Sequence, residues 1–120
     1  MHVELRREYH FEAAHRLPRL PATHKCHRLH GHSFRFEVTL EGEVDPYTGF
    51  LVDFGDVDVV VAPLVARLDH FYLNEIDGLE NPTSEVLAHW IWQRLRPALP
   101  LLRAVTVAET CDASCTYRGG

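Results

Sequence analysis

The sequence predicts an α+β protein built around an antiparallel sheet. Apolar and polar residues alternate over residues 32–41, as expected of a strand with one buried and one solvent-exposed face. Apolar residues over 57–68 instead recur at helical spacing, and residues 81–85 open a second helical segment. With weaker strand signals at both ends of the chain, the predicted order is strand, strand, helix, helix, strand, strand. Residues 1–120 suit one compact domain of this class.

The first two strands are predicted over residues 2–13 and 32–41. Their apolar positions are Tyr9, Phe11 and Ala13 in the first strand and Phe34, Phe36, Val38 and Leu40 in the second. Successive side chains of a strand point to opposite faces, so residues of one parity share a face. His15, His30 and His32 continue the buried parity of their strands. We therefore expect all three imidazoles at strand ends, facing the core.

The first helix is predicted after a turn at residues 45–49, which contain Asp, Pro and Gly. Asp53 or Asp56 is a suitable N-cap, and the apolar spacing continues to about residue 68. Pro63 falls inside this segment and indicates either a kink or a later start.

The second helix is predicted to begin with Thr83 or Ser84 as its cap and to end near residue 95, just before a proline. Weak alternation then predicts a third strand over residues 102–109 and a short fourth strand over 114–118. The predicted sheet therefore has four strands.

Composition narrows the class of protein. The net charge of −5 argues against a general nucleic-acid binder. No apolar run approaches the ~20 residues that span a bilayer, and residues 1–7 lack the apolar core of a signal peptide. Three cysteines are an odd number for a disulfide framework. We expect a cytoplasmic protein with reduced thiols and no membrane partner.

The three histidines at strand ends are the main candidate site. A single one would be read as an ordinary buried histidine or a loop residue. Three imidazoles that share a face can instead hold a zinc ion and leave a fourth position open, as catalytic zinc sites do. His15, His30 and His32 are therefore the predicted metal ligands.

Cys26 lies four residues before His30 and between the basic residues Lys25 and Arg28. These neighbours favour a reactive thiolate, but a small buried apolar residue is the alternative. The same two basic residues suit either phosphate binding or a solvated loop.

Asp69 and His70 follow the first predicted helix. They form either a carboxylate that orients an imidazole for proton transfer or an ordinary histidine at a helix C-terminus. Glu109 has the parity of its strand's buried face, so it needs a buried partner. That partner is either a cation such as Arg103 or a ligand with a guanidine-like edge, such as a pterin. Cys111 and Cys115 lack a ligand cluster nearby and are read as structural.

Nearly the whole chain resembles the 6-pyruvoyl-tetrahydropterin synthase family, and most of all its bacterial branch that forms 6-carboxytetrahydropterin in queuosine (7-deazaguanine) biosynthesis. The runs that carry the resemblance are Phe11 to Pro18, Cys26 to Ser33, Gly42 to Pro46, Leu68 to His70, Gly78 to Glu85, Glu109 to Cys111 and Cys115 to Gly119. Three residues separate Cys26 from His30. The pyruvoyl-forming branch has a longer insertion there, so this spacing favours the carboxy branch.

The resemblance implies the tunnelling fold, in which four antiparallel strands carry two helices on one face and subunits join their sheets into a barrel. It implies a homo-oligomer, usually a hexamer, with active sites between subunits. The matching positions are His15, His30 and His32 as zinc ligands, Cys26 as catalytic thiol, Asp69 with His70 as proton relay, and Glu109 as pterin anchor.

The implied reaction converts 7,8-dihydroneopterin triphosphate to 6-carboxytetrahydropterin, acetaldehyde and triphosphate. Two alternatives stay open at this point. The first is a sister enzyme that forms 6-pyruvoyl-tetrahydropterin at the same metal site. The second is a non-catalytic zinc- or pterin-binding domain, which would need neither a thiol nor an Asp–His pair.

Overall fold

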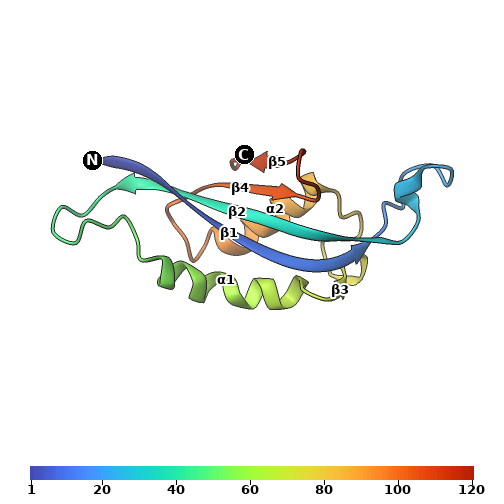
Figure 1. Ribbon diagram of the computed structural model, residues 1–120, viewed down its shortest axis with the longest axis horizontal. Helices are drawn as coiled ribbons and strands as arrows, with labels where there is room; N and C mark the ends of the chain where they lie inside the picture. The colour runs from blue at the N-terminus through green and yellow to red at the C-terminus, as the bar shows by residue number, and fades with distance from the viewer.

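The computed structural model describes residues 1–120 as a five-stranded sheet with two helices (Figure 1). The strand order is β3-β1-β2-β4-β5. The strands are β1 (His2–His15), β2 (His30–Glu43), β3 (Phe71–Tyr72), β4 (Leu102–Ala108) and β5 (Cys115–Tyr117), and the helices are α1 (Phe54–Leu68) and α2 (Ser84–Leu95). Short 3-10 turns occupy Lys25–His27 and Leu73–Glu75. The molecule is elongated, at 57 × 25 × 22 Å.

The frame of the fold is the antiparallel pair β1 and β2, each of 14 residues. Their register runs without a break from His2 opposite Glu43 to His15 opposite His30. Because register fixes which face every side chain occupies, this ladder carries the buried parity of both strands to their shared end. The predicted strands are confirmed, and both extend to include the histidines.

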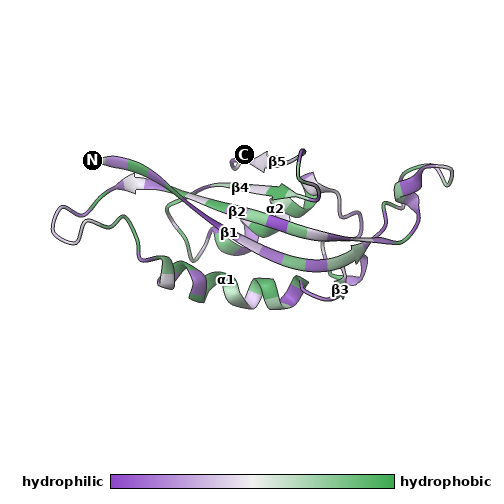
Figure 2. Cartoon of the chain, viewed as in Figure 1, coloured by the Kyte–Doolittle hydropathy of each residue, from purple (hydrophilic) through white to green (hydrophobic).

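One face of the sheet is apolar and packs against both helices. Figure 2 shows the alternation of hydrophobic and hydrophilic residues along the long strands. The fully buried strand side chains of the core include Phe34, Phe36, Val38 and Leu40 from β2 and Val105 and Val107 from β4. They pack in one cluster with Val57, Val61, Leu64 and Leu68 of α1 and Leu87, Ile91 and Leu95 of α2. The opposite face is polar, with Arg6, Glu37, Thr106 and Arg103 around one hollow.

The two helices begin where the sequence predicted. The side chain of Asp53 accepts a hydrogen bond from the Gly55 N–H at the start of α1, so Asp53 is the cap. The Thr83 hydroxyl does the same for α2, accepting from the Val86 N–H at 3.1 Å. Helix α1 continues through Pro63 without a break, so the proline does not mark a later start of the helix.

The sheet has one strand more than predicted. The additional strand, β3, pairs Phe71 and Tyr72 in parallel with Ala13 and Ala14 of β1, which makes the sheet mixed. A strand of two residues is too short to show an alternation of apolar and polar residues, so the sequence pattern did not predict β3. The other four strands are antiparallel, as predicted. No helix combines the length and the apolar character that a membrane crossing requires.

Candidate metal centre and active site

The rings of His15, His30 and His32 meet at the end of the β1–β2 pair. One potential ligand atom of each lies within 4.8 Å of the others. The ring centroids are 4.6 Å apart for His15 and His30, 5.1 Å for His15 and His32, and 4.9 Å for His30 and His32. The pairing of His15 with His30 across the last rung of the ladder brings residues 15 apart in sequence into this cluster. The predicted convergence of the three imidazoles is confirmed.

Hydrogen bonds to backbone carbonyls engage one ring nitrogen of His15 and one of His30, which leaves the other nitrogen of each ring available to a ligand. Nδ1 of His15 lies 2.9 Å from the Pro82 carbonyl, and Nδ1 of His30 lies 2.7 Å from the Arg28 carbonyl. A carbonyl only accepts, so each Nδ1 carries a hydrogen, and in the neutral form of each ring Nε2 keeps its lone pair. Carbonyl partners of this kind orient metal-binding histidines.

His15 Nε2 is a buried polar atom with no hydrogen-bond partner. The residue is fully buried, and burial lowers the pKa of its imidazole, so the neutral form is favoured. An unpartnered buried lone pair is unfavourable unless something accepts it. A metal ion would do so, and three neutral imidazoles suit Zn, Cu, Fe or Ni. The donor set therefore fits a metal ion.

Glu109 lies beside this cluster. Its Oε1 accepts a hydrogen bond from the Ser84 hydroxyl at 3.0 Å, and its Oε2 lies 3.7 Å from His32 Nε2. The side chain is 24% exposed and lines a cavity of about 460 Å³ at the start of α2. Arg103 instead pairs with Glu41 at 3.5 Å, so the expected alternative of an Arg103–Glu109 ion pair is wrong. The Glu109 carboxylate is therefore not closed in an ion pair with Lys or Arg and stays accessible from the cavity.

Asp69 and His70 form a pair in the connection from α1 to β3. His70 Nδ1 lies 3.0 Å from Asp69 Oδ2, and Asp69 Oδ1 accepts from the Glu12 N–H at 2.8 Å. The Glu12 hydrogen bond and then the His70 contact hold the pKa of the Asp69 carboxyl below its ordinary range. His70 is the only non-glycine residue with positive φ, at 63°. Such backbone strain is concentrated at functional sites.

A hollow of about 550 Å³ is lined by His70 and, from the histidine cluster, by His32; Asp69, His15 and His30 do not line it. Cys26 lines neither this hollow nor the cavity at Glu109. It lies in the 3-10 turn between β1 and β2, half-buried, with its carbonyl accepting from the Leu17 N–H at 2.8 Å. All three cysteines are free thiols.

Asn74 and Ser84, which the sequence did not indicate as site residues, support the site. The Asn74 side chain makes two hydrogen bonds with the backbone of Arg16, the residue after His15. It accepts from the Arg16 N–H at 2.9 Å and donates to the Arg16 carbonyl at 2.8 Å. Ser84 looked like a helix cap, and its actual partner is Glu109. Neither role has a sequence signal, because both depend on contacts between segments distant in sequence.

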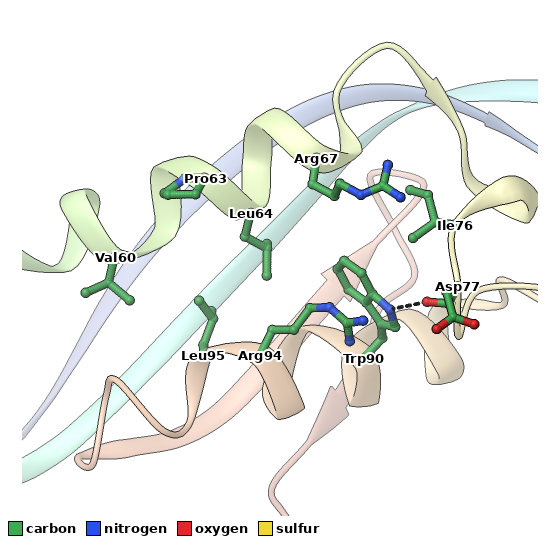
Figure 3. Close-up of a pocket in the computed structure, with 9 residues that line it drawn as sticks. All are labelled: Val60, Pro63, Leu64, Arg67, Ile76, Asp77, Trp90, Arg94 and Leu95. Atoms are coloured by element: carbon green, nitrogen blue, oxygen red, sulfur yellow. Dashed lines mark hydrogen bonds between the residues drawn. The ribbon is translucent and has the colours of Figure 1, made fainter.

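A separate groove of about 430 Å³ lies between the two helices (Figure 3). Its wall includes the Trp90 indole, which donates to the Asp77 carbonyl at 3.0 Å, and Arg94, whose guanidinium lies 3.7 Å from the centre of that ring. The Arg67 guanidinium lies 5.4 Å from the Phe71 ring. No predicted site residue lines this groove, so the candidate site is at the histidine cluster.

Asp69→Asn is expected to lower the free energy of unfolding at pH 7, by a difference from wild type that shrinks below about pH 4. The folded pKa of Asp69 lies below its ordinary 3.8, so its contribution is present above that value and is lost as the pH falls through the folded pKa. Urea unfolding of chelator-treated protein at a series of pH values measures this. Asp77→Asn is the control, since that carboxylate makes no hydrogen bond. An undiminished difference at pH 3 would contradict the prediction.

The fold and the histidine cluster together describe a small α+β protein with a candidate metal site at one end of its sheet. Residues 4–120 match the family model described as 6-pyruvoyl tetrahydropterin synthase. The chain belongs to this family.

Individual relatives agree with this membership. The chain is 44% identical over 117 residues to 6-carboxy-5,6,7,8-tetrahydropterin synthase of Synechocystis, covering 92% of this chain and 89% of the relative. It is 41% identical over 90 residues to dihydroneopterin monophosphate aldolase of Pyrococcus furiosus, covering 75% and 72%. The structure of 6-pyruvoyl tetrahydropterin synthase of Caenorhabditis elegans superposes with a TM-score of 0.92 at 29% identity, covering 100% and 97%. The chain is thus a lyase homologous to 6-carboxytetrahydropterin synthase.

Proposed function

We propose that the protein converts 7,8-dihydroneopterin triphosphate and water to 6-carboxytetrahydropterin, acetaldehyde and triphosphate, in queuosine biosynthesis. The observation that carries the proposal is the cluster of His15, His30 and His32, in which His15 and His30 have Nε2 lone pairs free and His15 Nε2 is buried without a partner. The 44% identity to the Synechocystis synthase supports the choice of reaction.

The metal is proposed to be zinc, bound by the three imidazoles with one position left open. Bound there, it would supply Lewis acidity toward an oxygen of the substrate side chain. Cys26, as a thiolate, is the base that removes a carbon-bound proton. His70 returns or relays protons, and Asp69 holds its ring through the 3.0 Å contact to Nδ1.

Glu109 is the proposed pterin anchor. A carboxylate can accept two parallel hydrogen bonds from the N–H groups of a guanidine-like edge. The 460 Å³ cavity beside Glu109 gives such a ring access to it, and the 3.7 Å separation between Glu109 and His32, one of the proposed metal ligands, supports this role. A pterin held there has its side chain directed toward the histidines.

The connection between β1 and β2 is proposed to hold the phosphates. Residues 16–29 contain four Arg or Lys and no Asp or Glu, in a chain whose net charge is −5. The Arg16 guanidinium has no carboxylate partner, since its Nη2 lies 3.3 Å from His27 Nε2 and its Nε is buried without a partner. Unpaired basic groups next to the site suit a polyanionic substrate.

The active unit is proposed to be a homo-oligomer, usually a hexamer in this family, with sheets joined into a barrel. Residues 2–12 of β1 have no strand on their outer side, because β3 covers only Ala13 and Ala14. A long unpaired edge is normally covered or paired. Pairing with the three-residue β5 edge of a second copy would cover part of it. Light scattering of the purified protein measures the assembly.

Formation of 6-pyruvoyl-tetrahydropterin is the second candidate, favoured by the similarity to the Caenorhabditis elegans structure. Incubation of purified, zinc-loaded protein with dihydroneopterin triphosphate, followed by mass analysis of products, decides between the two. Acetaldehyde and 6-carboxytetrahydropterin are expected. The pyruvoyl product would select the second candidate. No product at all, with the pterin still bound, would favour a binding domain.

Glu109→Ala is expected to weaken binding of 7,8-dihydroneopterin on the order of 100-fold, because the N–H groups of the pterin edge lose their acceptor. Glu109→Gln retains one acceptor oxygen and is expected to bind with an intermediate affinity. Zinc content should stay unchanged in both variants. Fluorescence titration with the pterin and metal analysis measure the two properties, and wild-type pterin affinity in Glu109→Ala would contradict the anchor role.

A further inference from the structure

We propose that Ser84 is the positioning residue for the pterin anchor: its hydroxyl sets the orientation of the Glu109 carboxylate. The inference rests on the proposed pterin function and deepens it. Ser84 is the first residue of α2, is half-buried, and donates to Glu109 Oε1 at 3.0 Å. This is the only hydrogen bond of its side chain.

The hydroxyl of Ser84 is not needed by its own helix. Residues at helix starts commonly use a hydroxyl to cap the free N–H groups of the first turn. Here Thr83 does so, with its Oγ1 accepting from the Val86 N–H at 3.1 Å. The two adjacent hydroxyl residues therefore have different partners. Thr83 caps α2, and Ser84 donates to Glu109, the residue that follows β4.

The carboxylate of Glu109 needs such a partner. A group that presents two oxygens to a planar edge must have its plane fixed, since bidentate recognition depends on that geometry. Glu109 has no cation partner from Lys or Arg, and its Oε2 faces His32 Nε2 at 3.7 Å. The Ser84 hydrogen bond on Oε1 opposes rotation of the carboxylate toward that imidazole. It occupies one lone pair of Oε1 and leaves the other for the ligand.

Both residues line the same 460 Å³ cavity, together with Thr110 and Ser114. Ser84 is therefore close enough to shape the wall against which a pterin would lie. Preorganised polar groups of this kind increase affinity because the ligand does not have to order them on binding.

The test is a double-mutant cycle with 7,8-dihydroneopterin as the probe and zinc-loaded protein. Ser84→Ala is expected to weaken pterin binding about tenfold, as for the loss of a hydrogen bond to a charged group. Ser84→Thr retains the hydroxyl and is expected to recover most of the affinity. In a Glu109→Ala background, Ser84→Ala is expected to have no further effect, because the residue acts only through Glu109.

Thr83→Ala is the matched control at the neighbouring position. It is expected to lower the melting temperature through loss of the cap and to leave pterin affinity unchanged. Equal pterin affinities of Ser84→Ala and wild type would overturn the inference, and so would a tenfold loss that persists in the Glu109→Ala background. Absence of pterin binding by the wild-type protein would instead contradict the proposed function itself.

Discussion

His30→Ala and His32→Ala are each expected to lose most of the bound metal, while the wild-type protein holds about one zinc per chain. The imidazoles of His15, His30 and His32 have potential ligand atoms within 4.8 Å of one another and form the whole candidate donor set. Loss of an outer partner of a ligand already lowers metal affinity about 10- to 100-fold, so loss of a ligand itself should exceed that. Metal analysis after dialysis measures the content, and competition with a chelator measures the affinity.

The control for this experiment is His10→Ala. His10 belongs to the same strand as His15, but its side chain is 69% exposed and its only ionic contact is with Glu8 at 3.7 Å. Its variant should keep the full zinc content. Circular dichroism should show that all the variants are folded, because the core cluster of strand and helix side chains includes none of these histidines. Full zinc retention in both His30→Ala and His32→Ala would reject the metal assignment.

Cys26→Ala is expected to lower turnover by about 100- to 10,000-fold while it retains zinc and pterin binding. Removal of a general base typically produces a loss of that size. Cys26 lies in a 3-10 turn outside the hydrophobic core, and its backbone contacts to Leu17 and His24 do not depend on the thiol. The mutation therefore removes the proposed base and is expected to have little effect on folding. Steady-state rates of product formation measure the change.

Cys111→Ala tests whether any loss is specific to the thiol at position 26. Cys111 is an exposed free thiol, so its variant should turn over at the wild-type rate. Cys26→Ala with near wild-type turnover would return Cys26 to the alternative of a small half-buried residue. The proton-abstracting base would then have to be sought among the residues that line the hollow shared by His32 and His70.

The long elements of the fold were predictable because each repeats a simple period many times. The alternation along β2 and the helical spacing of α1 both place large apolar residues in one core cluster. Strand β3 was not predictable, because its two residues carry no period and its pairing with Ala13 and Ala14 depends on where α1 ends. Pairings of that kind are set by tertiary structure rather than by local sequence.

The candidate site was predictable in part for the same reason. Parity along β1 and β2 indicates that His15, His30 and His32 share a face, and the register of the two strands brings them together. The partners of these residues were not predictable. Pro82 reaches His15 through a backbone carbonyl, which every residue has, and Ser84 meets Glu109 across 25 positions of sequence.

The last rung of the β1–β2 ladder joins His15 to His30, so the 16–29 connection starts and ends at two of the three proposed metal ligands. Insertions or deletions within that connection leave the register of the two strands, and hence the ligands, in place. The thiol of Cys26 and the basic side chains all lie on this connection. The length and composition of this connection can therefore change without rebuilding the histidine cluster on which the proposed metal site depends.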